Sequence, residues 1–199
     1  MKIFILRVLK TFITMSFGIF MFLMAGEINK GFNNIQKQTQ NKTIINPVEI
    51  QKNSNIESYI MKINPKVYPE LASLIAKSIE SASIEFKVDP IIILAIIHQE
   101  STFYPFAVSS AECIGLMQIH LKIWKKNLIE NNLIKNEFDL YNPTINVRCG
   151  TYILNHYLEI EDGDYRQALQ RYYGVKTSEE YYNKISGKVF NYIKIYEEK

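Results

Sequence analysis

The chain has 199 residues, of which 47% are hydrophobic, 13% aromatic and 22% charged. This length suits one ordinary domain with extensions and gives no support for two full domains. The formal net charge is +3, and Lys2, Arg7 and Lys10 supply three positive charges near the start, so the rest of the chain is formally neutral. A neutral remainder lacks the basic surface that nucleic acids require, which argues against a nucleic-acid-binding protein.

The first 26 residues have the pattern of an export signal. A basic head is followed by an uncharged, mostly apolar run from Thr11 to Gly26. The run is slightly short for a membrane-spanning helix, which needs about 20 apolar residues, and the small-residue cleavage site near Ala25 is poor. We therefore expect residues 1–26 to be a cleaved signal peptide or a retained anchor, their only contact with a membrane. In either case the protein is expected in the periplasm or cell envelope.

Residues 27–66 are polar and rich in Asn, Gln and Lys, with scattered Ile and no sustained period. Such a segment buries too little apolar surface to offset its chain entropy. The sequence predicts a flexible linker here, with a short helical piece at 56–63. The folded domain is predicted to span residues 67–199.

The folded domain is predicted to be mainly α. Asp89 followed by Pro90 is a helix start signal, because Asp caps free N–H groups and Pro suits the first helical position. No alternating strand pattern and no internal repeat is present. Apolar residues recur at helical spacing in six stretches, at 67–86, 91–100, 117–131, 144–158, 165–173 and 179–196.

Glu100 stands at the end of a strongly apolar predicted helix. The helix dipole disfavours a carboxylate there by about 0.3–1 kcal/mol, so a reason other than helix stability is expected. If Phe103, Tyr104 and Met117 close around Glu100, desolvation raises its pKa, as a general acid working near neutrality requires. Taken alone, the segment favours an ordinary exposed helix-end glutamate.

The order of the following segments favours the catalytic interpretation. Residues 100–109 read Glu-Ser-Thr-Phe-Tyr-Pro-Phe-Ala-Val-Ser, and residues 115–118 read Gly-Leu-Met-Gln. Together they resemble the catalytic segment of lytic transglycosylases, whose pattern is Glu-Ser-x-Phe-x-Pro-x-Ala-x-Ser followed by Gly-Leu-Met-Gln. Residues 139–143, 146–154 and 168–174 resemble further segments of that family. The resemblance covers roughly residues 67–196.

The resemblance implies a goose-lysozyme-like helical domain with a groove for peptidoglycan glycan strands. By position, Glu100 would protonate the glycosidic oxygen between N-acetylmuramic acid and N-acetylglucosamine. It would then accept a proton from the muramyl 6-hydroxyl, which closes a 1,6-anhydro ring. In such enzymes the substrate's N-acetyl group assists, which removes the need for a second carboxylate.

The resemblance also assigns the other site residues. It implies that Ser101 lies near Glu100, that Met117 lines the groove and that Gln118 contacts bound sugar. Tyr172 matches a tyrosine whose hydroxyl can reach the catalytic carboxylate, and Tyr173 stands where the family carries a sugar-contacting Asn. For each of these residues, packing or helix capping is the alternative role.

Glu112, Cys113 and Cys149 also depart from the family pattern. Glu112 could bring a second carboxylate nearby, and Cys113 and Cys149 replace small residues in segments that could approach each other, so a disulfide is a hypothesis. The three histidines, at 98, 120 and 156, match no zinc spacing. We predict no metal ion and no cofactor.

Two other functions stay open at this stage. A hydrolytic muramidase on the same fold would use Glu112 or Asp139 to activate water. A non-catalytic peptidoglycan-binding assembly protein would keep the groove without turnover. The small size also resembles transglycosylases that serve secretion machines or pili, so such an envelope-spanning assembly is an expected partner.

Overall fold

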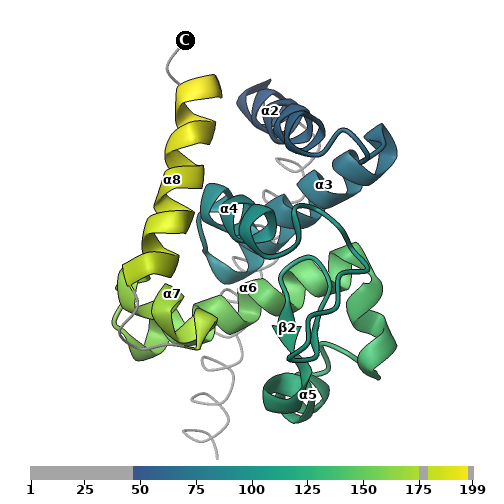
Figure 1. Ribbon diagram of the computed structural model, residues 1–199, viewed down its shortest axis with the longest axis vertical. Coiled ribbons are helices and arrows are strands. Elements are labelled where there is room, and N and C mark those ends of the chain that lie inside the picture. Colours follow the sequence, from purple (N-terminus) through teal and green to yellow (C-terminus); the bar gives the residue numbers. More distant parts are fainter. Residues whose placement is uncertain (1–46, 175–178, 197–199) are drawn as a thin grey trace, which may run out of the picture. The chain divides into compact units, whose positions relative to one another are not determined.

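A computed structural model of the chain describes residues 47–174 and 179–196 (Figure 1). It divides into two compact units, residues 1–49 and 50–199, and every predicted site residue belongs to the second. The predicted export segment 1–26 and the linker as far as residue 46 lie outside the described residues. Within the described part, no helix combines the length and apolar character needed to cross a membrane.

The fold is mainly helical, as predicted. The elements in chain order are α2 (Pro47–Ile63), α3 (Pro69–Phe86), α4 (Pro90–Ser101), β1 (Cys113–Ile114), β2 (Ile119–His120), α5 (Leu121–Glu130), the 3-10 helix η1 (Glu137–Tyr141), α6 (Pro143–Ile160), α7 (Tyr165–Tyr173) and α8 (Glu179–Tyr196). The predicted ends of α7 and α8 agree with the structure, and those of α3, α4 and α6 agree within two residues.

One predicted helix boundary is wrong. We expected a helix from residue 117, but α5 begins at Leu121 because the chain before it forms a two-stranded antiparallel hairpin. Cys113 pairs with His120, and Ile114 pairs with Ile119. Gln118 has a φ of +48°, a left-handed conformation that a continuous α-helix cannot contain.

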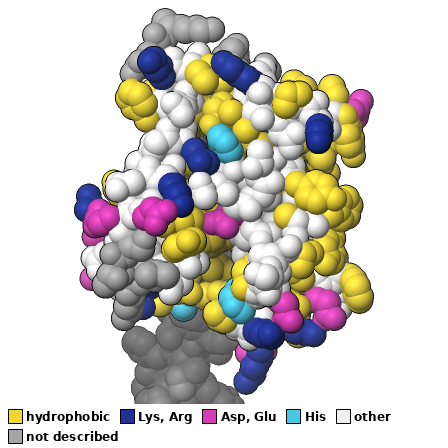
Figure 2. All heavy atoms as spheres, in the orientation of Figure 1, with side chains coloured by type: hydrophobic (Ala, Val, Ile, Leu, Met, Phe, Trp, Pro, Cys, Tyr) yellow, Lys and Arg dark blue, Asp and Glu magenta, His cyan; other side chains and the backbone are white. Residues whose placement is uncertain are grey.

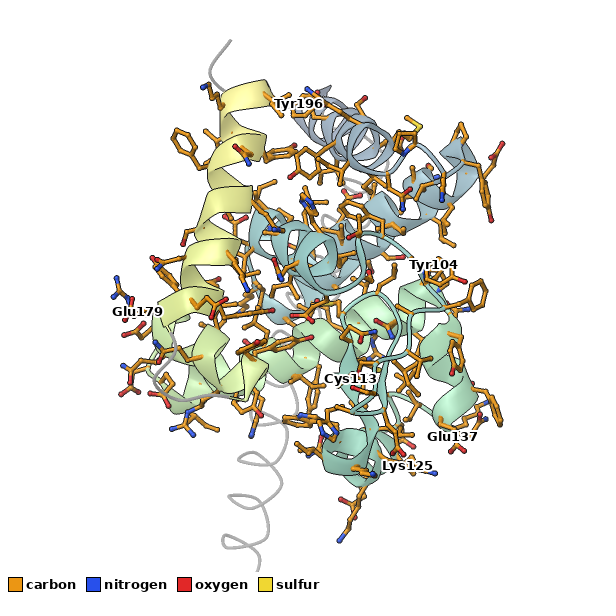
Figure 3. The ribbon with its side chains drawn as sticks, viewed as in Figure 1. Tyr104, Cys113, Lys125, Glu137, Glu179 and Tyr196 are labelled. Atoms are coloured by element: carbon orange, nitrogen blue, oxygen red, sulfur yellow. The ribbon has the colours of Figure 1, made fainter. Side chains whose placement is uncertain are left out.

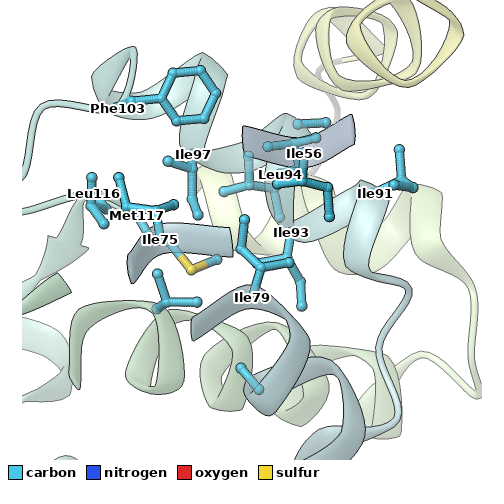
Figure 4. Close-up of a cluster of buried hydrophobic side chains, with 14 of the residues drawn as sticks. Ile56, Ile75, Ile79, Ile91, Ile93, Leu94, Ile97, Phe103, Leu116 and Met117 are labelled. Carbon is cyan, nitrogen blue, oxygen red and sulfur yellow. The ribbon is translucent and has the colours of Figure 1, made fainter. Parts of the chain in front are cut away.

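Helix α4 is the centre of the core (Figure 4). Asp89 caps it by accepting a 2.7 Å hydrogen bond from the N–H of Ile91, and Pro90 occupies the first helical turn. Six of its apolar residues, from Ile91 to Ile97, are buried, and each fully buried Ile or Leu side chain contributes about 1.5–3 kcal/mol. Helix α4 packs against α3 and α8, while α3 packs on α6. The apolar run therefore fixes the position of Glu100 rigidly.

Part of the segment predicted as a flexible linker is helix α2. It runs from Pro47 to Ile63, and Ile56, Tyr59 and Ile60 are at most 1% exposed within the main core. Figure 4 shows Ile56 among the core side chains. Sparse apolar residues in a polar segment suffice here because they are spaced three and four apart and share one helix face. The folded unit therefore begins before residue 67.

Candidate active site

Glu100 lies in the last turn of α4, and its side chain is partly buried. The hydroxyl of Tyr181 donates a 2.5 Å hydrogen bond to its Oε1 atom. Burial raises the pKa of Glu100 above its ordinary value of 4.5, and the hydrogen bond from Tyr181 opposes that rise. A dehydrated carboxyl with a raised pKa can keep its proton at a pH where exposed glutamates have lost theirs.

Tyr181 is held rigidly in its place on α8. Its side chain is 1% exposed, and the ring of Tyr173 stacks on it with centroids 4.7 Å apart and planes 14° apart. Burial, and then the charge of Glu100, raises the pKa of Tyr181 well above the ordinary value, so this hydroxyl remains a donor. Tyr181 was not predicted from the sequence. Its contact with Glu100 joins positions 81 residues apart.

The backbone directly after Glu100 is strained. Thr102 and Phe103 have φ values of +48° and +64°, and non-glycine residues adopt this region rarely. Such strain persists only where surrounding contacts enforce it. One contact comes from Asn64, just after α2, whose side-chain amide donates a 2.8 Å hydrogen bond to the carbonyl of Thr102. The segment predicted as linker therefore helps to fix the turn beside Glu100.

The residues expected to enclose Glu100 are mostly elsewhere. Phe103 is fully buried, but it stacks on His98 and meets Tyr59 edge-on. Tyr104 is 55% exposed and lies at the outer edge of the molecule (Figure 3). Tyrosines of α7 and α8 lie near Glu100 instead, because burial and then the charge of Glu100 raise the pKa of both Tyr172 and Tyr181.

Glu100 opens into a cavity of about 280 Å³ between α5, α7 and the hairpin. Figure 2 shows a furrow on this face with an acidic side chain at its floor. Among the described residues that line the cavity, Glu100 is the only carboxylate. The other lining residues are Ser109, Cys113, Gln118, Ile119, His120, Ile123, Trp124, Ile153, Tyr157, Arg171, Tyr172, Tyr173 and Gly174.

Gln118 lies in the cavity wall, as its predicted role requires. Its side-chain amide nitrogen donates to the carbonyls of Ala107 and Gly115, at 3.2 and 3.0 Å. These bonds hold its left-handed backbone and point the amide in one direction. Gly115 has a φ of +81°, and a side chain at this position would clash with Asn146 and with the carbonyl of Leu140. The conformation of the loop therefore depends on glycine at this position.

Asn146 of α6 ties this loop to the core. It is 1% exposed, its Oδ1 accepts from the N–H of Met117 at 2.9 Å, and its Nδ2 donates to the carbonyls of Ile114 and Leu140 at 3.0 and 2.7 Å. Because the buried amide forms all three hydrogen bonds, it holds the loop backbone in one conformation. Asn146 thus positions Gln118 without touching the cavity.

Met117 does not line the groove, contrary to the expectation. Its side chain is fully buried and packs against Gly150 of α6, where an added Cβ would lie 2.5 Å from the Met117 sulfur. Figure 4 shows it among the core residues. The backbone of Met117 serves the site instead, because the hydroxyl of Tyr172 donates a 2.8 Å hydrogen bond to its carbonyl.

Ser101 and Tyr172 have other partners than the resemblance implied. The Ser101 hydroxyl donates to the carbonyl of Ile97, one turn earlier in α4, and Ser101 does not line the cavity. The Tyr172 hydroxyl binds the Met117 carbonyl, and Tyr181 makes the tyrosine contact to Glu100. Tyr173 is 49% exposed and lines the cavity.

Neither proposed second acid is in the cavity. Glu112 is exposed and forms an ion pair of 3.2 Å with Lys122. Asp139 accepts hydrogen bonds from the backbone N–H groups of Lys135 and Asn136, which makes it a structural cap of η1. Both carboxylates are therefore occupied by structural contacts.

Both cysteines are free thiols in the structure. Cys113 lines the cavity, and Cys149 is buried, which raises its pKa to about 12. A thiol with so high a pKa is a poor nucleophile. Within the described ranges, no group of three or more His, Cys, Asp or Glu side chains is arranged to hold a metal ion.

The helical fold and the buried carboxylate in a cavity fit the class that the sequence resemblance suggested. Residues 77–197 match the family described as Transglycosylase SLT domain, and the chain belongs to this family. A solved structure of an inactive mutant of lytic transglycosylase Slt from Pseudomonas aeruginosa shares the fold, with a TM-score of 0.54 and 17% identity. That match covers 60% of this chain and 24% of the other.

Curated relatives carry the description Membrane-bound lytic murein transglycosylase C. The protein from Actinobacillus pleuropneumoniae is 28% identical over 159 residues, which covers 68% of this chain and 42% of the relative. The protein from Yersinia enterocolitica is 29% identical over 160 residues, covering 79% of this chain and 41% of the relative. This chain therefore spans about two fifths of the length of these relatives.

Proposed function

We propose that this protein is a peptidoglycan lytic transglycosylase that cleaves between N-acetylmuramic acid and N-acetylglucosamine and leaves 1,6-anhydromuramyl ends. The observation that carries the proposal is the isolation of Glu100. It is dehydrated, bonded to Tyr181, and the only carboxylate among the described residues of the cavity wall. Membership of the Transglycosylase SLT domain family supports the same reaction.

One carboxyl group suffices for this chemistry. Protonated Glu100 gives its proton to the glycosidic oxygen as the bond from that oxygen to muramyl C1 breaks, while the N-acetyl oxygen of the same sugar bonds to C1. The resulting carboxylate then takes the proton of the muramyl 6-hydroxyl, whose oxygen bonds to C1 as the N-acetyl oxygen leaves. Because the substrate supplies both nucleophiles, no second acid is needed.

The cavity wall supplies the remaining functions. Gln118 and Tyr173 contact the sugars, the former through its fixed amide and the latter through its exposed ring. Tyr172 acts through the Met117 carbonyl and Tyr181 directly on Glu100, so both are positioning residues. His120, whose Nδ1 is buried without a partner among the described residues, offers a further polar contact.

A hydrolytic muramidase is the second candidate, since it would use the same fold. The contacts of Glu112 and Asp139 weigh against it, because neither carboxylate faces the cavity. A non-catalytic glycan-binding protein would not require a dehydrated acid, whose burial carries a free-energy cost.

The test compares release of soluble muropeptides from purified cell-wall sacculi by the wild type and Glu100→Gln. Loss of general acid catalysis is expected to slow release by about a hundredfold or more. Glu130→Gln, the same change on the exposed end of α5, is the matched control and should digest like the wild type. Equal digestion by all three proteins, or by none, would remove the proposal.

We also propose that residues 1–26 direct export, so that the enzyme acts in the periplasm or cell envelope. The curated relatives described as membrane-bound support an envelope location. An envelope-spanning secretion or pilus assembly is the proposed partner, on the basis of the small catalytic domain alone.

A further inference from the structure

Helix α8 presents one charged residue on the face that it packs against α4. Tyr181, Ile185 and Tyr192 are buried on this face, with spacings of four and then seven residues. Lys188 falls seven residues after Tyr181 and therefore shares the same stripe. It is partly buried, whereas the other lysine at the end of this helix, Lys194, is exposed.

Lys188 has no acidic partner in the described part of the chain, since none of the ion pairs there includes it. Lys184, one turn earlier, is paired with Glu180 at 2.6 Å. Burial, together with the charge of Lys184, lowers the pKa of Lys188. A partly dehydrated cation without a counter-ion costs stability, and packing alone does not explain its presence on an apolar face.

His98 is on α4, which packs against α8, and the charge of Lys188 acts on its imidazole. Its ring stacks on Phe103, and its Nδ1 shares a 2.9 Å hydrogen bond with the Tyr59 hydroxyl. Burial and the nearby charge of Lys188 lower the pKa of His98 to about 4, so the imidazole is neutral at neutral pH. Lys188 is therefore the positive charge of this pair, and His98 is an uncharged polar neighbour.

This pair lies beside the catalytic site, on the far side of the end of α4. His98 and Glu100 are two residues apart and project to opposite sides of the helix, about one helix diameter or roughly 10 Å from each other. Helix α8 spans both sides, with Tyr181 at Glu100 and Lys188 near His98. Figure 2 shows an acidic side chain, histidines and Lys or Arg side chains together on one face of the described part of the chain.

A glycan strand that reaches Glu100 along this furrow would bring its substituents to Lys188. The muramyl residues of peptidoglycan carry peptides with free carboxylates, and an amine with a hydrogen-bonding neighbour is a suitable receptor for a carboxylate. We propose that Lys188, assisted by His98, binds a stem-peptide carboxylate and makes the protein favour peptide-bearing strands over strands stripped of peptides. This inference rests on the proposed function.

Binding can test the inference without turnover. Fluorescently labelled glycan strands, with their peptides intact or removed by an amidase, are titrated with the Glu100→Gln protein and with Glu100→Gln carrying Lys188→Gln. The second change is expected to weaken binding of peptide-bearing strands about fivefold and to leave binding of stripped strands unchanged. Lys194→Gln, in the same background and on the same helix, is the control and should change neither affinity.

The outcomes separate the two proposals. A Lys188→Gln protein that binds both strand types like its parent, or that loses affinity for both equally, overturns the role of Lys188. Equal affinity of the parent protein for the two strand types also overturns it. If the wild type prefers peptide-bearing strands in binding but does not cleave them, the enzymatic proposal is contradicted and the role of Lys188 is not.

Discussion

The hydroxyl of Tyr181, on α8, donates a 2.5 Å hydrogen bond to the Oε1 atom of Glu100, the proposed catalytic carboxyl. The phenol stabilises the carboxylate, and burial stabilises the protonated form. The pKa of Glu100 therefore reflects the balance of two opposed effects from the same enclosure. The ring of Tyr173, stacked on that of Tyr181, keeps the Tyr181 hydroxyl in position to make this hydrogen bond.

Tyr181→Phe is expected to shift the pH profile. Loss of the hydrogen bond that favours the carboxylate raises the pKa of Glu100 further, and the first step needs the protonated acid. The basic limb of kcat/KM against pH therefore moves to higher pH, while kcat falls about tenfold because the carboxyl loses its positioning. Tyr173→Phe, which keeps the stacked ring, should leave the limb where it is in the wild type. A basic limb that stays fixed in Tyr181→Phe would refute this role.

Glu100→Gln is expected to stabilise the folded protein near neutral pH. Below pH 4.5, the ordinary pKa of Glu, folded and unfolded chains are both protonated and the substitution changes little. Above it the unfolded chain loses its proton first, so the stability of the wild type falls as the pH rises toward the folded pKa. Thermal unfolding at pH 7 and at pH 4 should show a higher Tm for the variant at pH 7 only. An equal or lower Tm at pH 7 would contradict a dehydrated Glu100.

The sequence predicted the helical class and the core because long apolar runs with clear caps define α4 and α6 regardless of tertiary context. It also directed attention to Glu100 and Gln118, whose motif segments are close in the sequence, and the two side chains line one cavity, while their roles stay predictions. Tyr181 escaped notice because only the crossing of α8 over α4 brings it to Glu100. The spacing of the buried residues of α8 was the available signal.

Met117 illustrates a different failure. Its position in the motif indicated that Met117 lies near the site, and its backbone does. The left-handed conformation of Gln118, however, directs the side chains of Met117 and Gln118 to opposite sides. Met117 enters the core against Gly150, and Gln118 reaches the cavity. Side-chain direction at such a turn depends on backbone angles that a motif does not specify.

Truncation tests the corrected domain boundary. A chain that starts at Pro47 is expected to unfold cooperatively like the full chain. A chain that starts at Val67 loses three fully buried side chains, each contributing about 1.5–3 kcal/mol, and the bond from Asn64 to Thr102. It should be several kcal/mol less stable by urea titration. Equal stability of the two would show that α2 does not belong to the folded unit.

Gly115→Ala is expected to destabilise the cavity loop. Its φ of +81° and the overlap of a Cβ with Asn146 and with the Leu140 carbonyl both oppose a side chain. Gly163→Ala is the matched control, because Gly163 has a φ of +85° with open space around it and so measures the backbone strain alone, about 1–2 kcal/mol. Denaturant unfolding should show a larger loss for Gly115→Ala. Equal losses would mean that the loop relaxes around the added methyl group.

The most direct test of the central claim is the chemistry of the muramyl ends released from peptidoglycan digested in water enriched in heavy oxygen. With Glu100 as the only acid among the described residues that line the cavity and the 6-hydroxyl as nucleophile, mass spectrometry should find ends lighter by one water than a reducing sugar and without heavy oxygen. Reducing ends that carry heavy oxygen would mean that water attacks, and the account of a single carboxyl group acting without a second acid would then be wrong.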